Sequence, residues 1–452
     1  MRHALVPILL LLALYAPCAD RSPAPIVHGP LSIVHAPLSI VLGDQRPALY
    51  LPLLEGRRVA LFSNHTGLVD GRHILDVLLD QGVDVTAIFS PEHGFRGTAD
   101  AGEHVASQVD PQTGIPILSL YNGRDPRPSA ESMGRFDVLV VDIQDVGLRF
   151  YTYYITMCRL MDACAEHGKA VVVLDRPNPN GHYVDGPVLE RKHRSGVGQL
   201  PIPIVHGMTL GELALMVQGE GWLTGGRTCE LTVVPCLGYT HATPYTLTVA
   251  PSPNLPCQKA VLLYPSTCLF EGTVMSLGRG TDWPFQVYGH PDLKGSVDDA
   301  SAMGQPSSAP TAALATAMQS PASSTASQGL SKAHTSTSRR TDVHDCTFTP
   351  RSRPGAKRPP LEGKACRGVD LTGISDEAIR QEGRIRLCYL IDAYRRMGIG
   401  DRFFTAFFEK LVGVDYVRQM IEAGCSEDEI RARWQPDVEA FKQVRAKYLL
   451  YE

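Results

Sequence analysis

The sequence predicts an α/β fold, in which a Rossmann-like parallel sheet domain is followed by a second, smaller C-terminal α+β domain. The first observation is a set of five short apolar runs, rich in β-branched residues, that alternate with segments of helical spacing. The second is the length of 452 residues, which is large for one ordinary core. The runs read RVALFSN, VDVTAIFS, IPILSLY, DVLVVDIQD and AVVVLDRPN.

The N-terminus predicts export. A basic start precedes an apolar block, residues 4–15, that is short for a membrane span, and small residues follow at a plausible cleavage point. We therefore expect a signal peptide over residues 1–18 and a protein of the periplasm or cell envelope. A membrane is an expected partner only if Cys18 carries lipid. Residues 19–50 are expected to be a linker, in which the unit IVHGPLS is repeated as IVHAPLS.

Charge and cysteine content argue against nucleic acid and zinc as binding partners. The net charge is -4 and no long basic tract occurs, so nucleic acid is not an expected partner. The eleven cysteines include no CxxC pair, so a structural zinc site is not expected either. The local candidates for disulfides are Cys229/Cys236, Cys257/Cys268 and Cys346/Cys366.

The Rossmann-like domain is expected over residues 51–205. Gly71 to Gln81 and Thr152 to His167 have the apolar spacing of helices between the strands. No GxGxxG motif follows the first strand, so the nucleotide fingerprint of such folds is missing. Ligands of an open parallel sheet bind beyond the carboxyl ends of its strands. The polar residues at these ends are Asn64 and His65; Glu92 and His93; Tyr121 and Asn122; Asp142, Gln144 and Asp145; Asp175, Arg176 and Asn178.

The second domain is expected over residues 206–452. Residues 296–343 are dominated by Ser, Ala, Thr and Gln, which predicts a disordered insertion. The chain after Ser375 has a helical pattern, and Pro436 is expected to open the last helix because proline suits a first helical turn. Other expected features are a helix over Thr209 to Gln218 capped by Thr209 and Glu212, a strand over Glu230 to Pro235, and a capping box at Ser426.

Eight sequence blocks follow one another between about Arg57 and Tyr451, interrupted by the low-complexity insertion. They read SNHTG, FSPEHGFRG, VVDIQDVGLRFYTY, LDRPNPNG, VDGPVLE, PIPIVHGMTLGELA, LFEGTVMSLGRGTDWPFQVYG and WQPDVEAFKQVRAKYLLY. Together and in this order, they resemble the exo-β-N-acetylmuramidase (NamZ) family, glycoside hydrolase family 171.

The resemblance implies a Rossmann-like domain joined to a smaller domain, with the site in the cleft between them. It implies an enzyme that removes N-acetylmuramic acid from the non-reducing ends of peptidoglycan glycan fragments, with no metal or organic cofactor. It also implies that the glutamate of the SPEHG motif, here Glu92, is catalytic. This sequence departs from the family at His65, where many relatives carry Gln.

Glycoside cleavage normally uses two carboxyl groups, one protonated and one ionised. Burial beside apolar residues raises the pKa of a glutamate, and Glu92 follows an apolar strand, so it is the expected general acid. The alternative is that Glu92 caps a helix or pairs with Arg96. His93 either orients Glu92, binds a sugar hydroxyl or has a structural role. The second carboxyl group is left open between Asp142, Asp145 and Glu271, and the acetamido group of the sugar can also assist.

Muramic acid differs from glucosamine by a lactyl carboxylate, which a guanidinium fork can bind. One of four arginines in the motif blocks is expected to bind it, although each alone would fit a structural ion pair. Trp283 is a candidate platform for a sugar ring. The expected substrate-binding residues are Asn64, Arg96, Gln144, Arg149, Tyr151, Arg176, Asn178 and Arg279.

Two other functions fit parts of the sequence. A non-catalytic binding protein for cell-wall muropeptides or sugars would also be exported and carry arginines suited to the lactyl group. A metal-dependent hydrolase could be built on His65, His93, Asp142 and Asp145, but their spacing matches no standard metal motif.

Overall fold

The computed structural model describes residues 39–91, 94–95, 108–120, 127–295 and 343–452. The predicted signal peptide with Cys18, most of the N-terminal repeat, and the predicted insertion up to residue 342 lie outside the described residues.

The larger sheet confirms the predicted α/β class. Its seven strands run in the order β5-β6-β4-β1-β7-β8-β9, and all neighbours are parallel except the short edge strand β5. All five predicted apolar runs are strands of this sheet. β9 comes from beyond residue 205, where the first domain is predicted to end; the division itself stays a prediction. The strands are β1 (Arg58–Ser63), β4 (Asp84–Ser90), β5 (Gln108–Val109), β6 (Pro116–Ser119), β7 (Val138–Asp142), β8 (Ala170–Leu174) and β9 (Leu231–Val234).

Helices cover both faces of this sheet, as its continuous apolar strands predict. In β7, Val138 and Val140 pack in the apolar cluster with α1 and α2, whereas Leu139 and Val141 pack in the cluster with α4 and α5. This alternation follows from the two-residue period of a strand. The helices are α1 (Pro47–Leu54), α2 (Ile74–Asp80), α3 (Ala130–Met133), α4 (Tyr153–His167) and α5 (Leu210–Gly219), and a small hairpin joins β2 (Leu68–Val69) to β3 (Arg72–His73).

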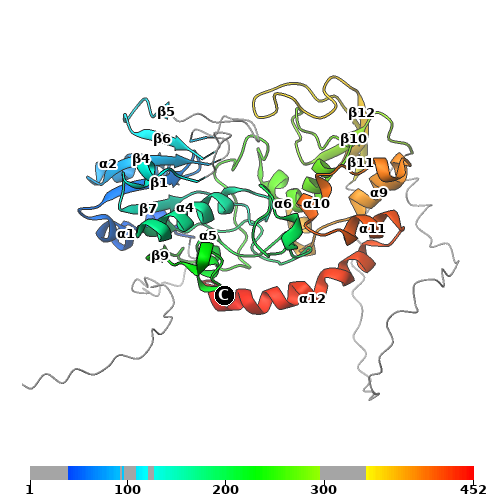
Figure 1. Cartoon of the computed structure of the whole chain (residues 1–452). Helices are drawn as coiled ribbons and strands as arrows, with labels where there is room; N and C mark the ends of the chain where they lie inside the picture. The colour runs from blue at the N-terminus through cyan, green and yellow to red at the C-terminus, as the bar shows by residue number, and fades with distance from the viewer. Residues whose placement is uncertain (1–38, 92–93, 96–107, 121–126, 296–342) are drawn as a thin grey trace, which may run out of the picture.

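The second domain combines a three-stranded antiparallel sheet, in the order β10-β12-β11, with several helices (Figure 1). Phe285, Val369 and Phe403 of this domain belong to the same apolar cluster as Phe62 and Phe89 of the first domain. The two domains therefore share one core, which positions one against the other. The elements are α6 (Gln258–Thr267), β10 (Val287–His290), β11 (His344–Phe348), β12 (Cys366–Asp370), α8 (Asp376–Glu382), α9 (Cys388–Met397), α10 (Phe408–Val412), α11 (Tyr416–Glu422) and α12 (Glu427–Arg445).

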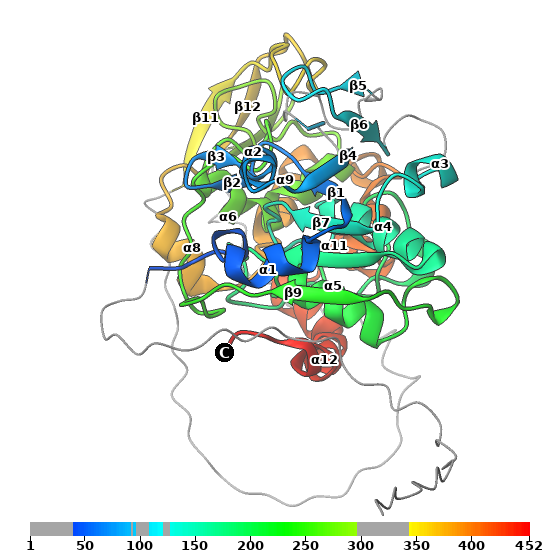
Figure 2. The same ribbon diagram turned by 90° about the vertical axis from the view of Figure 1, so that its left-hand side faces the viewer.

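The last helix, α12, runs beneath both domains and brings the C-terminus below α5 (Figures 1 and 2). Ser426 and Glu429 form the predicted capping box at its start. The prediction that Pro436 opens the last helix was wrong, because Pro436 lies inside α12. Proline cannot donate a hydrogen bond to the carbonyl of Ala432, but both residues are exposed, so water can satisfy that carbonyl.

The end of the N-terminal repeat belongs to the fold. Val41 forms an isolated antiparallel bridge with Leu237, beyond the edge strand β9. Gly43 then passes so close to the sheet that an added Cβ would lie 2.4 Å from the carbonyl oxygen of Val234. Only glycine allows this approach, and it carries the next residue, Asp44, into the protein interior.

The ten described cysteines are all free thiols, so the three predicted disulfide candidates are not bridged. In one of these pairs, Cys346 on β11 lies opposite Gly368, and Cys366 on β12 lies opposite Phe348, so the two cysteines are not cross-strand partners. Among the described residues, no helix combines the length and apolar character that crossing a membrane would require.

Candidate active site

The carboxyl ends of β1, β4 and β7 meet at one edge of the larger sheet. Ser63 at the end of β1 pairs with Asp142 at the end of β7, and the strand order reverses between these two strands. Such a reversal is the usual ligand position in open α/β sheets. Glu92, His93 and Arg96, which follow β4 in the sequence, lie outside the described residues.

The predicted amide side chains at this edge bind other parts of the protein. Asn64 accepts hydrogen bonds from the backbone N (2.9 Å) and hydroxyl (2.6 Å) of Thr66, and its amide donates to Tyr153 (3.0 Å). Gln144 donates to the carbonyls of Asp145 and Pro177, both at 2.8 Å. In the same way, Asn178 donates to the carbonyl of Met208. These contacts hold the loops after the strands in place.

Asp142 lies in a buried cluster of charges. Its Oδ1 accepts a hydrogen bond from Nε of Arg176 at 2.6 Å, and the same guanidinium pairs through Nη2 with Asp44. Both aspartate side chains are 0% exposed. Burial and the charge of Asp142 raise the pKa of Asp44, although Arg176 opposes them. Two carboxyl groups thus share one cation, and Arg176 is already engaged on two sides.

Asp44 is a member of this cluster that sequence reasoning missed. It meets Arg176 across 132 positions of sequence. The only local signal is the glycine before it, and a lone glycine does not identify a buried acid.

Asp145 is buried next to the start of α4. Its Oδ1 accepts a hydrogen bond from the backbone N of Gly147 at 2.7 Å. Burial raises the pKa of the Asp145 carboxyl to about 7, against backbone N–H groups that lower it. A carboxyl group that can hold a proton near neutral pH at this edge suits acid–base chemistry.

We expect the Asp145→Asn substitution to flatten the dependence of stability on pH. The folded protein holds a proton on Asp145 that the unfolded chain releases near pH 4, so this stabilisation is complete below about pH 4 and lost as the pH rises to about 7. The slope over this window is about 1.4 kcal/mol per pH unit. Asparagine keeps the acceptor for Gly147 and carries no charge.

Melting temperatures at pH 5 and pH 8 test this expectation, with Asp84→Asn as the matched control at an exposed position. The fall in melting temperature between the two pH values should be smaller in Asp145→Asn than in the wild type and the control. Equal falls in all three proteins would contradict it.

A loop of the second half of the chain closes against this edge. The hydroxyls of Tyr151 (2.9 Å) and Tyr153 (3.1 Å) donate to the carbonyl of Pro251, and Nε2 of His65 donates to the carbonyl of Ala250 at 2.8 Å. The predicted substrate-binding residue Tyr151 is therefore buried, and it links the carboxyl edge of the larger sheet to the loop around Pro251.

Glu271 and Arg279 form a partly exposed ion pair in the second domain. Nη1 of Arg279 lies 3.2 Å from Oε1 of Glu271, and Nε donates to Oδ1 of Asn254 at 3.2 Å. The two charged side chains are 24% and 20% exposed, respectively. The other catalytic and substrate-binding candidates that the structure describes are buried, except the predicted sugar platform Trp283, which is 48% exposed.

Arg149 lies away from solvent and binds four carbonyls. Nη1 donates to Pro187 (2.6 Å) and Ile202 (2.9 Å), and Nη2 donates to Leu411 and Val412, both at 2.8 Å. These contacts link the two domains and favour a structural role. Its assignment to substrate stays a prediction.

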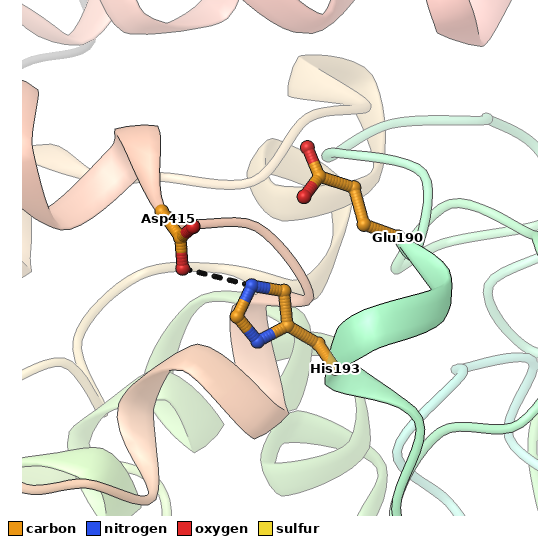
Figure 3. A group of neighbouring side chains, drawn as sticks. All are labelled: Glu190, His193 and Asp415. Carbon is orange, nitrogen blue, oxygen red and sulfur yellow. Dashed lines mark ion pairs between the residues drawn. The ribbon is translucent and has the colours of Figure 1, made fainter.

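One group of side chains in the described ranges could hold a metal ion, namely Glu190, His193 and Asp415, whose ligand atoms lie within 4.8 Å of one another (Figure 3). His193 points to Asp415, and Lys192 pairs with both carboxylates. The ammonium group of Lys192 therefore already supplies the positive charge that a metal ion would bring to these two carboxylates. The group does not include His65, Asp142 or Asp145, on which the metal-dependent alternative depends.

A hollow of about 640 Å³ lies between α1 and the turn of residues 81–84. These elements precede β1 and β4, so the hollow is at the amino ends of the strands. It is on the wrong edge of the sheet for the ligand site of such a fold.

The fold and the site define a two-domain α/β protein of the Rossmann-like class, with buried acidic side chains at the carboxyl edge of its larger sheet. The model of the exo-beta-N-acetylmuramidase NamZ N-terminal domain matches residues 59–259, and that of the C-terminal domain matches residues 262–451. The chain therefore belongs to the NamZ family and is a glycoside hydrolase, which confirms the resemblance seen in the sequence.

Relatives of known name or structure agree with this assignment. The chain is 34% identical over 410 residues to the peptidoglycan beta-N-acetylmuramidase NamZ of Bacillus subtilis (strain 168), covering 89% of each chain. A crystal structure of a DUF1343 family protein from Bacteroides fragilis NCTC 9343 shares 53% identity, with a TM-score of 0.76 over 92% of this chain and 99% of that one. A second protein of that family and organism shares 27% identity, with a TM-score of 0.69 over 91% of this chain and 99% of that one.

Proposed function

We propose that this protein is an exo-acting β-N-acetylmuramidase that releases N-acetylmuramic acid from the non-reducing ends of peptidoglycan glycan fragments. The observation that carries the proposal is the match of both halves of the chain, in order, to the two domains of the NamZ family. The name of the Bacillus subtilis relative supports peptidoglycan as the substrate. The predicted export, to the periplasm or cell envelope, would place the enzyme with this polymer.

We assign the general acid to Glu92, which follows β4 at the carboxyl edge of the sheet in sequence. For the second carboxyl group, contact with the sugar is required. Asp142 is fully buried and bound to Arg176, whereas Glu271 is partly exposed. This contrast favours Glu271 over Asp142, and the raised pKa of Asp145 suits a proton donor better than an ionised group.

Of the arginines predicted to bind the lactyl carboxylate, Arg279 fits best in the described part of the chain. Arg149 and Arg176 are buried. The N–H groups of Arg149 donate to backbone carbonyls, and those of Arg176 donate to the carboxylates of two aspartates. Arg279 keeps its side chain partly exposed and donates to Asn254. A guanidinium so placed can bind a carboxylate with two parallel hydrogen bonds.

The test is to incubate the purified protein with a short glycan that has muramic acid at its non-reducing end and to identify the products by mass spectrometry. We expect free N-acetylmuramic acid and a glycan shortened by one sugar. Internal cleavage would contradict the exo mode. Binding of the glycan without any turnover would favour the non-catalytic binding protein.

A further inference from the structure

Trp283 exposes an aromatic surface in the second domain. In the part of the chain that the structure describes, the exposed large apolar side chains are Val109, Leu237 and Trp283, and only Trp283 is aromatic. The residue is 48% exposed. An indole left half in water loses apolar burial, so its exposure in an otherwise well-packed domain points to a binding role.

The loop that carries Trp283 is held by its own hydrogen bonds. The hydroxyl of Thr281 donates to the carbonyl of Gly278 at 2.6 Å and accepts from the backbone N of Trp283 at 3.0 Å. The carbonyl of Trp283 accepts from the backbone N of Gln286 at 3.1 Å. The indole is thus presented on a rigid turn, and little conformational entropy would be lost on binding.

Phe285 anchors the same loop in a strained conformation. Its φ angle is 62°, which is unusual for a residue other than glycine, yet its side chain is buried. The ring packs against Tyr264 at 4.7 Å between centroids, and its backbone N donates to Leu277 at 2.8 Å. Strain of this kind persists only where the surroundings determine the conformation, and it occurs often at ligand sites.

The backbone of Trp283 lies beside the residue that precedes Arg279 of the partly exposed ion pair. An added Cβ on Gly278 would lie 2.4 Å from the carbonyl oxygen of Trp283, so the turn brings Trp283 back to the residue before Arg279. Arg279 binds Glu271 and Asn254. Asn254 belongs to the same loop as Pro251, which binds the tyrosines at the carboxyl edge of the larger sheet. The loop of Trp283 thus combines an exposed aromatic side chain with the charged group of Arg279, and such a combination is well suited to a sugar.

We propose that Trp283 is the platform for the N-acetylglucosamine ring on the leaving-group side of the cleaved bond. This inference rests on the proposed exo activity. An enzyme that removes one terminal sugar must enclose that sugar, while the rest of the glycan extends into solvent. The first sugar ring of the leaving glycan would have one face against the protein and the other face in solvent. A half-exposed indole can pack against the protein-facing side of such a ring.

The test is calorimetric binding of a β-1,4-linked trisaccharide of N-acetylglucosamine, which contains no muramic acid to be released. We expect the wild type to bind it, Trp283→Ala to weaken binding about tenfold, and Trp283→Phe to recover most of the loss. Val109→Ala removes an exposed apolar side chain from β5, next to the amino end of β6, and should bind like the wild type. Melting temperatures should stay unchanged, because both side chains are exposed.

Kinetics on the muramic-acid-terminated glycan separate a platform from a group that acts in bond cleavage. Trp283→Ala should raise KM with kcat nearly unchanged. A fall in kcat alone, no binding of the trisaccharide by the wild type, or equal binding by Trp283→Ala would each overturn the inference. Binding that depends on Trp283 in a protein that releases no muramic acid would instead contradict the exo-muramidase proposal, and Trp283 would remain only an N-acetylglucosamine-binding residue with no leaving-group side.

Discussion

Glu92→Gln should reduce the release of N-acetylmuramic acid from the muramic-acid-terminated glycan by about a thousandfold or more. Glutamine keeps the size of the side chain but can neither give nor take the proton that the leaving oxygen needs, and general acid–base groups contribute about 10² to 10⁴ in rate. Initial rates at saturating substrate measure the effect. The melting temperature of the variant should match that of the wild type.

Glu55→Gln is the matched control for this experiment. Glu55 is exposed and lies before β1, at the amino edge of the sheet, so the same change there should leave the rate unaltered. Full activity of Glu92→Gln would remove Glu92 from the mechanism. Substitution of Glu271, Asp145 and Asp142 would then decide which carboxyl group is essential.

Arg149→Met should have the largest effect on stability. The substitution keeps the apolar stem but leaves four buried carbonyls without a donor, two of them at the carboxyl end of α10. Burial lowers the pKa of Arg149 to about 10, so its guanidinium is still charged at neutral pH. Each orphaned carbonyl costs about 1 to 3 kcal/mol, so we expect a loss of about 5 kcal/mol and a fall in melting temperature on the order of 10 °C.

Differential scanning calorimetry of Arg149→Met and of Arg191→Met measures this loss. Arg191 is exposed, so the same chemical change there should shift the melting temperature by no more than about 1 °C. If the two variants have the same melting temperature, the four carbonyl contacts of Arg149 do not stabilise the association of the two domains. A ligand role for Arg149 would then regain support.

Most of the larger sheet could be predicted because its signals are local. Each predicted strand is a run of apolar residues whose two faces are both covered, and the pattern of β7 shows the alternation between two clusters. The helices begin where short capping motifs predict, at Thr209 and Ser426. The prediction for Pro436 was wrong. Proline is common in the first turn of a helix, but an exposed helix interior, as in α12, also tolerates it.

The candidate site was harder to predict. Polar residues do follow the strands, but Asn64, Gln144 and Asn178 bind other parts of the protein. Whether a side chain at a strand end faces a ligand or a neighbouring loop depends on that loop. The loop around Pro251 comes from a distant part of the chain, and no local pattern predicts its contact with Tyr151.

By itself, the sequence determined the fold class, the family and the positions of the chemically capable residues, because strand periodicity, helix caps and ordered motifs are properties of neighbouring residues. Only the tertiary structure decided which of those residues are buried and paired. Asp44 meets Arg176, Arg149 meets the end of α10, and Glu271 stays partly exposed beside Arg279. Burial and charge pairing arise between segments that are far apart in the chain, so their effect on each carboxyl group appears only once the chain is folded.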